Sequence, residues 1–188
     1  ATPLLIKERL RKGPQSIPTL LSRIEKPVIA AVNGVATGAG LDMALMCDLR
    51  FAAEGARLGE TYAKVGLVPG AGGAYFLPRL VGVAKALELF WGAELLTAQE
   101  ALQIGMVNRV YPDAELLKKT REFATRIANS PPISIQLIKR AVYQSAVSDL
   151  PTALDLVSSH MTVARSSRDH GEAIAALREK RRGVYEGR

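Results

Sequence analysis

The 188-residue chain contains one cysteine, Cys47, so no disulfide can form within it. A single cysteine is typical of proteins in a reducing compartment, and it predicts a cytoplasmic location. Every apolar run falls short of the roughly 20 residues that a membrane-spanning helix needs, and we therefore expect no membrane association. Aromatic residues make up only 5% of the chain. So few aromatic residues disfavour a protein that stacks the bases of single-stranded nucleic acid.

Basic residues outnumber acidic ones, 25 to 18, which gives a net charge of +7. They gather in residues 6–13 ("IKERLRKG") and 177–188 ("LREKRRGVYEGR"). Such runs are most often solvated helix faces, and the functional alternatives are a phosphate-rich ligand or nucleic acid. The two histidines, His160 and His170, have no metal-ligand spacing around them, and we expect no bound metal.

The order of apolar patterns predicts an α/β core followed by helices. Residues 26–34 ("KPVIAAVNG") are typical of a buried strand, residues 41–49 have helical spacing, and residues 49–59 return to strand character. Thr97 is expected to cap a further helix that ends at Gly105. We expect an α/β core over residues 1–112 and a helical part over residues 113–188. The predicted C-terminal helices cover residues 114–128, 133–147, 151–164 and 170–182.

Residues 34–45 ("GVATGAGLDMAL") place small residues where a strand turns into a helix. A helix start carries unpaired N–H groups and a partial positive charge, and glycine lets a ligand oxygen approach them. Close packing of helix on strand would explain the same glycines. A dinucleotide-binding turn is excluded because Met43 stands where G-x-G-x-x-G requires its third glycine.

Four segments of the chain carry a combined pattern: residues 26–59, 66–82 ("GLVPGAGGAYFLPRLVG"), 95–112 ("LLTAQEALQIGMVNRVYP") and 169–181 ("DHGEAIAALREKR"). Together they resemble the enoyl-CoA hydratase/isomerase (crotonase) superfamily. The resemblance implies a spiral of ββα units followed by helices, which assembles as homotrimers or dimers of trimers. Members of this superfamily carry further strands ahead of the matching part, so we expect N-terminal units to be missing from this chain.

The resemblance also implies an oxyanion hole, in which two backbone N–H groups hold the thioester oxygen of an acyl-CoA. One of these groups belongs to Ala39, which Gly38 and Gly40 flank, and the other is expected ahead of residue 1. The first of the two catalytic acids of the family corresponds to Asp42, one helical turn after Ala39. An acid in the first turn of a helix is also favoured by the helix dipole, without any catalytic role.

The second catalytic acid of the family corresponds to Tyr62, which departs from the glutamate of the hydratases. A phenol titrates near pH 10 and is a poor base at neutrality, although it can donate a hydrogen bond or a proton. Glu60 lies close by in the sequence. It is either an acid that reaches the site or a surface acid. We expect a surface acid, because residues two apart in a helix face different ways.

The last segment of the resemblance implies a site for coenzyme A. The family places an apolar residue near the adenine and a lysine near the ribose phosphate, and the matching positions are Leu177 and Lys180. Coenzyme A is then part of the substrate, and no separate cofactor is expected. The basic net charge suits its phosphates.

These observations predict an acyl-CoA enzyme that hydrates an enoyl-CoA in the degradation of fatty acids or related acids. Because Tyr62 replaces the second glutamate, double-bond isomerisation or another reaction that uses one carboxylate stays open. A hypothesis from another class is an RNA-binding member of the superfamily. The basic charge favours it, and the lack of aromatic residues in the basic runs disfavours it.

Overall fold

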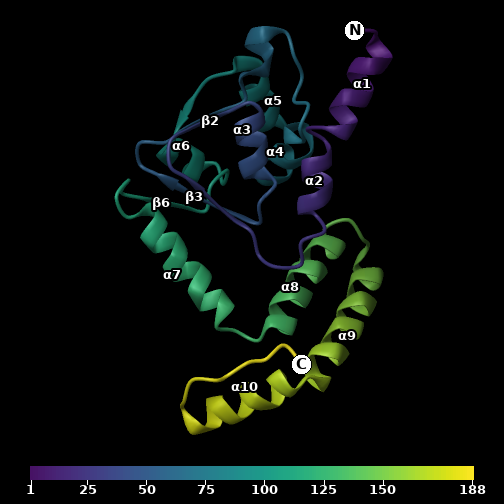
Figure 1. Ribbon diagram of the computed structural model, residues 1–188, viewed down its shortest axis with the longest axis vertical. Helices are drawn as coiled ribbons and strands as arrows, with labels where there is room; N and C mark the ends of the chain where they lie inside the picture. The colour runs from purple at the N-terminus through teal and green to yellow at the C-terminus, as the bar shows by residue number, and fades with distance from the viewer. The chain divides into compact units, whose positions relative to one another are not determined.

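The computed structural model describes residues 1–188 (Figure 1). The chain forms two compact units. The first contains residues 1–24 and 28–120, and the second contains residues 25–27 and 121–188. The division therefore falls eight residues beyond the predicted boundary at residue 112, inside a helix that begins in the first unit.

Two three-stranded sheets lie in the first unit. One is parallel throughout, in the order β1-β3-β6, and the other pairs β2 parallel and β5 antiparallel with β4. The predicted strand in residues 26–34 is confirmed as β1, and the strand character of residues 49–59 divides into β3 and β4. The strands are β1 (Ile29–Val32), β2 (Val35–Thr37), β3 (Leu49–Ala53), β4 (Arg57–Gly59), β5 (Leu96–Thr97) and β6 (Arg109–Tyr111).

Six α-helices and one 3-10 helix of the first unit lie entirely within it. The predicted cap is confirmed: the Thr97 hydroxyl accepts the Glu100 N–H at 3.2 Å, and the Glu100 carboxylate accepts the Thr97 N–H at 2.7 Å. These helices are α1 (Pro3–Lys12), α2 (Ser16–Leu21), α3 (Ala39–Leu45), the 3-10 helix η1 (Thr61–Val65), α4 (Gly73–Val81), α5 (Val83–Gly92) and α6 (Ala98–Gln103).

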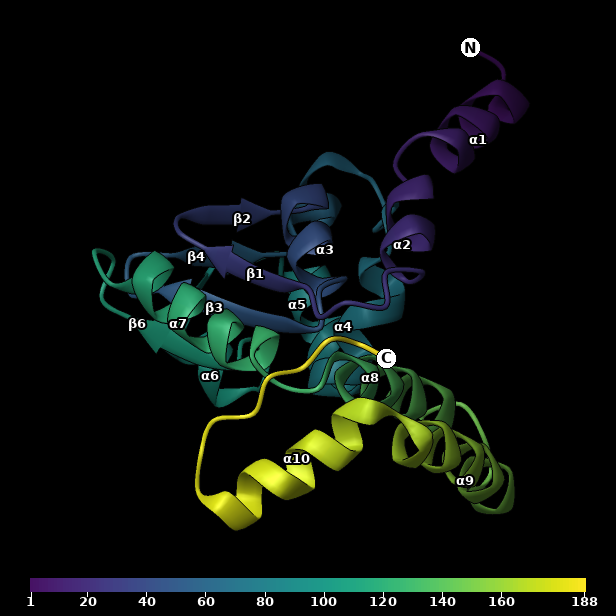
Figure 2. The ribbon, with the colours of Figure 1, turned by 60° about the horizontal axis from the view of Figure 1, so that its bottom comes forward.

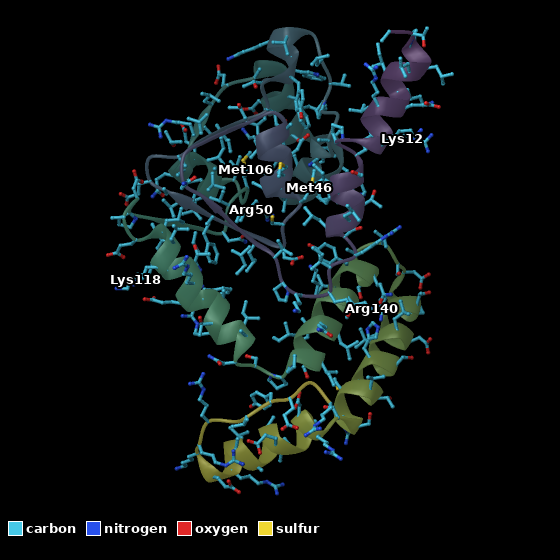
Figure 3. All side chains as sticks on the ribbon, viewed as in Figure 1. Lys12, Met46, Arg50, Met106, Lys118 and Arg140 are labelled. Carbon is cyan, nitrogen blue, oxygen red and sulfur yellow. The ribbon has the colours of Figure 1, made fainter.

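The core of the first unit joins α3 to the sheets and to α4. Apolar side chains from these elements are buried together, among them Leu41, Leu58 and Leu77. Arg50 on β3 is also buried, and its guanidinium donates to the carbonyls of Met106 at 2.8 Å and Cys47 at 2.6 Å (Figure 3). These bonds tie the chain just after α3 to the segment before β6.

The second unit is helical. It contains the end of α7 (Leu116–Ala128), followed by α8 (Pro132–Ser145), α9 (Leu150–Ser166) and α10 (Arg168–Glu179). The four predicted C-terminal helices are confirmed, with ends that differ by up to three residues. After α10 the chain folds back along that helix, because the buried Asp169 carboxylate accepts the N–H groups of Glu186 and Gly187, each at 2.8 Å (Figure 2). None of the helices has the length and apolar character needed to cross a bilayer.

Candidate active site

The turn between β2 and α3 sets the geometry of the site. Gly38 has φ 50°, a conformation that favours glycine, and its N–H donates to the carbonyl of Gly59 at 3.0 Å. This bond fixes the start of α3 beside the end of β4. Gly38 caps the helix without a side chain, and Ala39 and Gly40 are exposed. The expected strand-to-helix turn is therefore present, with the start of α3 open to a ligand.

Asp42 is fully buried in the first turn of α3. Its Oδ2 accepts the Tyr62 hydroxyl at 2.8 Å and the Ala71 N–H at 3.2 Å. The Tyr62 ring lies over Gly38, where an added Cβ would be 3.6 Å from Cζ. The two positions that the sequence singled out as the acid and its partner are thus in direct contact.

Glu60 is only 1% exposed, so the expectation of a surface acid is wrong. It does not share a helix with Tyr62, because it precedes η1 with a non-helical backbone, φ −93° and ψ 80°. Helical periodicity therefore does not relate the two side chains. The carboxyl group of Glu60 turns inward and lies beside that of Asp42, and no N–H or hydroxyl of the protein donates to either Glu60 oxygen or to Asp42 Oδ1.

Burial, and then the charge and hydrogen bonding of Asp42, raise the pKa of Glu60 from 4.5 to about 9. Glu60 is therefore a neutral carboxylic acid at neutral pH, and its proton supplies the hydrogen bond between the two carboxyl groups. Burial, followed by the hydrogen bond to Asp42, also raises the pKa of the Tyr62 phenol above its ordinary value. Tyr62 consequently stays protonated and acts as a donor.

Gly73, the first residue of α4, lies against both carboxyl groups. A Cβ at this position would collide with Asp42 Oδ1 and would lie 3.0 Å from Glu60 Oε1. Sequence reasoning missed Gly73 as a residue of the site. The available signal was the second glycine turn, residues 69–73 ("PGAGG"), which resembles the first turn in leading into a helix.

We expect Gly73→Ala to lower the free energy of unfolding by about 2 kcal/mol, because the new methyl group must displace a buried carboxyl group. Denaturant titration measures the change. The matched control is Gly171→Ala in α10, where a Cβ meets open space and alanine should be neutral or stabilising. Equal stability of Gly73→Ala and the wild type would contradict the proposed close approach of α4 to the two carboxyl groups.

Leu177 and Lys180 lie in the second unit, at the C-terminal end of α10. Both are exposed, and Lys180 ends the helix in a left-handed conformation with φ 55°. They are three residues apart in the sequence, and Lys180 lies just beyond the last residue of α10. Their contact with coenzyme A stays a prediction. No three His, Cys, Asp or Glu side chains of the structure gather as a group that could hold a metal ion.

Comparison with known proteins assigns the chain to a family. The profile of the enoyl-CoA hydratase/isomerase family matches residues 6–188. The short-chain-enoyl-CoA hydratase of Clostridium acetobutylicum is 40% identical over 162 residues, 86% of this chain and 62% of that protein. The crotonyl-CoA hydratase of Syntrophomonas wolfei is 37% identical over 171 residues, 91% of this chain and 66% of that protein.

The fold agrees with the sequence match. A crystal structure of enoyl-CoA hydratase from Bacillus anthracis superposes with a TM-score of 0.91 at 38% identity, covering 96% of this chain and 71% of that one. The chain belongs to the enoyl-CoA hydratase/isomerase family and has the crotonase fold. It spans 62% and 66% of the lengths of the two curated relatives.

Proposed function

We propose that the protein is an acyl-CoA enzyme that adds water across the double bond of an enoyl-CoA. One observation carries the proposal: the open start of α3 at Ala39 lies one helical turn from a buried Asp42 whose carboxylate is bonded to the Tyr62 hydroxyl. The first feature suits a thioester oxygen that gains negative charge, and the second suits proton transfer beside it.

The Ala39 N–H is proposed to hold the thioester oxygen. As a nucleophile adds to the β-carbon, the electron pair of the double bond moves toward that oxygen and an enolate forms. A fixed backbone donor at a helix start stabilises this charge, and one such donor is typically worth about 3 kcal/mol of barrier. Gly38 and Gly40 leave the approach free of side chains.

Tyr62 is proposed to relay protons between water and Asp42, because Asp42 has no exposed surface of its own. Water gives a proton to the Tyr62 oxygen while Tyr62 passes its own proton to Asp42 Oδ2, and the hydroxide oxygen bonds to the β-carbon. Asp42 then returns its proton through Tyr62 to the α-carbon. Tyr62 is a neutral phenol before and after each transfer, which agrees with its raised pKa.

Double-bond isomerisation is a second candidate. It is favoured by the single ionised carboxylate of the site, since Glu60 keeps its proton near neutrality. The same Asp42–Tyr62 route would take a proton from the α-carbon and return it to the γ-carbon. Hydration passes through the enolate of a hydroxyacyl thioester and isomerisation through a dienolate. Both place negative charge on the same thioester oxygen, so the product distinguishes the two reactions.

Incubation with crotonyl-CoA tests the proposal. We expect the enoyl-thioester absorbance to decay and a 3-hydroxyacyl-CoA to appear in mass spectrometry. An isomerase would instead convert a 3-enoyl-CoA to a 2-enoyl-CoA without any gain in mass. Failure to turn over any enoyl-CoA would contradict the proposed function.

Lys180 is proposed to bind a phosphate of coenzyme A, near Leu177. We expect Lys180→Ala to weaken the binding of an acyl-CoA by about 1–2 kcal/mol, through the loss of one charge-assisted contact. Calorimetry at low salt measures the change. Lys118→Ala, an exposed lysine on α7, is the matched control and should bind as the wild type does. Unchanged affinity of Lys180→Ala would refute this assignment.

Self-association as a homotrimer or a dimer of trimers is proposed because the second unit exposes many large apolar side chains, which a second copy would cover. Light scattering at micromolar concentration tests this proposal, and a monodisperse monomer would contradict it. The exposed apolar side chains of the second unit include Ile138, Val142, Val147, Leu150, Leu154 and Met161. We also propose a cytoplasmic location for the protein.

A further inference from the structure

The buried carboxyl group of Glu60 has no part in the relay from Tyr62 to Asp42. It is 1% exposed, and no protein N–H or hydroxyl donates to either of its oxygens. An ionised carboxylate in that position would have neither solvent nor donors to stabilise it. A neutral carboxylic acid has a hydrogen to donate, and Asp42 Oδ1 is the adjacent acceptor that lacks a donor.

The two carboxyl groups are unequally supplied with donors, which decides where the proton resides. Asp42 Oδ2 accepts both the Tyr62 hydroxyl and the Ala71 N–H. Glu60 accepts neither of them nor any other protein donor. Hydrogen bonds to an ionised carboxylate favour its charged form, so Asp42 carries the charge and Glu60 the proton.

We infer that Glu60 is a positioning residue, whose protonated carboxyl group donates to Asp42 Oδ1 and holds Oδ2 toward Tyr62. The effect of Glu60 on turnover rests on the proposed function, the reaction with an enoyl-CoA. The titratable groups that act on Glu60 are Asp42 from α3 and Tyr62 from η1. From α4 comes the backbone of Gly73, which packs against both carboxyl groups.

Two substitutions separate the hydrogen bond from the shape of the side chain. Glu60→Gln keeps a donor of the same size, and we expect its kcat at pH 7 to stay close to that of the wild type. Glu60→Met fills the same space without a donor. We expect kcat to fall about 10-fold with KM little changed, because Asp42 is no longer held in place. Equal kcat for Glu60→Met and the wild type would overturn the inference.

The dependence of kcat on pH tests directly whether Glu60 carries a proton. Glu60 ionises as the pH rises through its raised pKa of about 9, and the donor is then replaced by a second negative charge beside Asp42. We expect the kcat of the wild type to fall there and that of Glu60→Gln to lack this fall. Identical alkaline limbs in the two proteins would overturn the inference, even if Glu60→Met failed to fold.

The dependence of the free energy of unfolding on pH tests for the Glu60 proton without any measurement of enzyme activity. The pKa of Glu60 is higher in the folded than in the unfolded chain, so its stabilising contribution is complete below the unfolded value and is lost as pH rises through the folded value. Denaturant midpoints of Glu60→Gln should therefore exceed those of the wild type by a margin that grows between pH 6 and 9. A constant margin means that Glu60 holds no proton and overturns the inference. A growing margin without enoyl-CoA turnover supports the buried proton and refutes the proposed function alone.

Discussion

Replacing Asp42 with asparagine should lower the turnover of an enoyl-CoA about 10²–10⁴-fold. Asparagine has nearly the same shape, and its carbonyl oxygen can still accept the Tyr62 hydroxyl and the Ala71 N–H that Asp42 accepts at 2.8 and 3.2 Å. It cannot take up a proton near neutrality, so no group accepts the proton that Tyr62 would pass on from water. Steady-state kinetics on the substrate that the wild type turns over measures the loss.

The loss should appear in kcat and leave acyl-CoA binding intact, because Ala39 and the fold hold the thioester. Asp149→Asn is the matched control. Asp149 caps α9 by accepting the Thr152 N–H at 2.9 Å, and asparagine caps equally well, so activity should not change. Full activity of Asp42→Asn on every acyl-CoA would show that Asp42 is only a helix-start acid.

Tyr62→Phe should lower hydration about 10²-fold, since the ring remains over Gly38 but the hydroxyl that joins Asp42 to water is gone. Product formation from crotonyl-CoA measures this loss. Tyr62→Glu restores the glutamate of the hydratases, and we expect it to hydrate crotonyl-CoA at least as fast as the wild type does.

Tyr75→Phe is the control for the loss of a phenol, because Tyr75 is exposed on α4. A negligible effect of Tyr62→Phe would mean that the phenol only shapes the pocket. Isomerisation through one carboxylate would then be the better interpretation of the site.

Local patterns predicted most elements of the fold because short-range physics determines them. Thr97 and Glu100 are three residues apart, and the capping box that they form needs no distant partner. The helices beyond residue 113 were likewise predicted from their apolar spacing. The pairing of strands into two separate sheets was not, because it depends on contacts between distant parts of the chain.

The site was predicted only in part, and Glu60 shows why. The sequence singled out Asp42 and Tyr62, whose side chains are in contact, but it treated residues 60–62 as one helix. The backbone of Glu60 is not helical, and its side chain is buried beside Asp42. The role of Gly73 could not be inferred either, because it arises from the approach of α4 to side chains from two other elements.

The most direct test of the account is the isotopic composition of the product formed from crotonyl-CoA in deuterated, oxygen-18-enriched water. NMR and mass spectrometry of the thioester locate both labels. The account predicts one deuterium at the α-carbon and one oxygen-18 at the β-carbon for the wild type, with both labels nearly lost in Asp42→Asn. Equal labelling by the wild type and Asp42→Asn, or no labelling by the wild type, would contradict it.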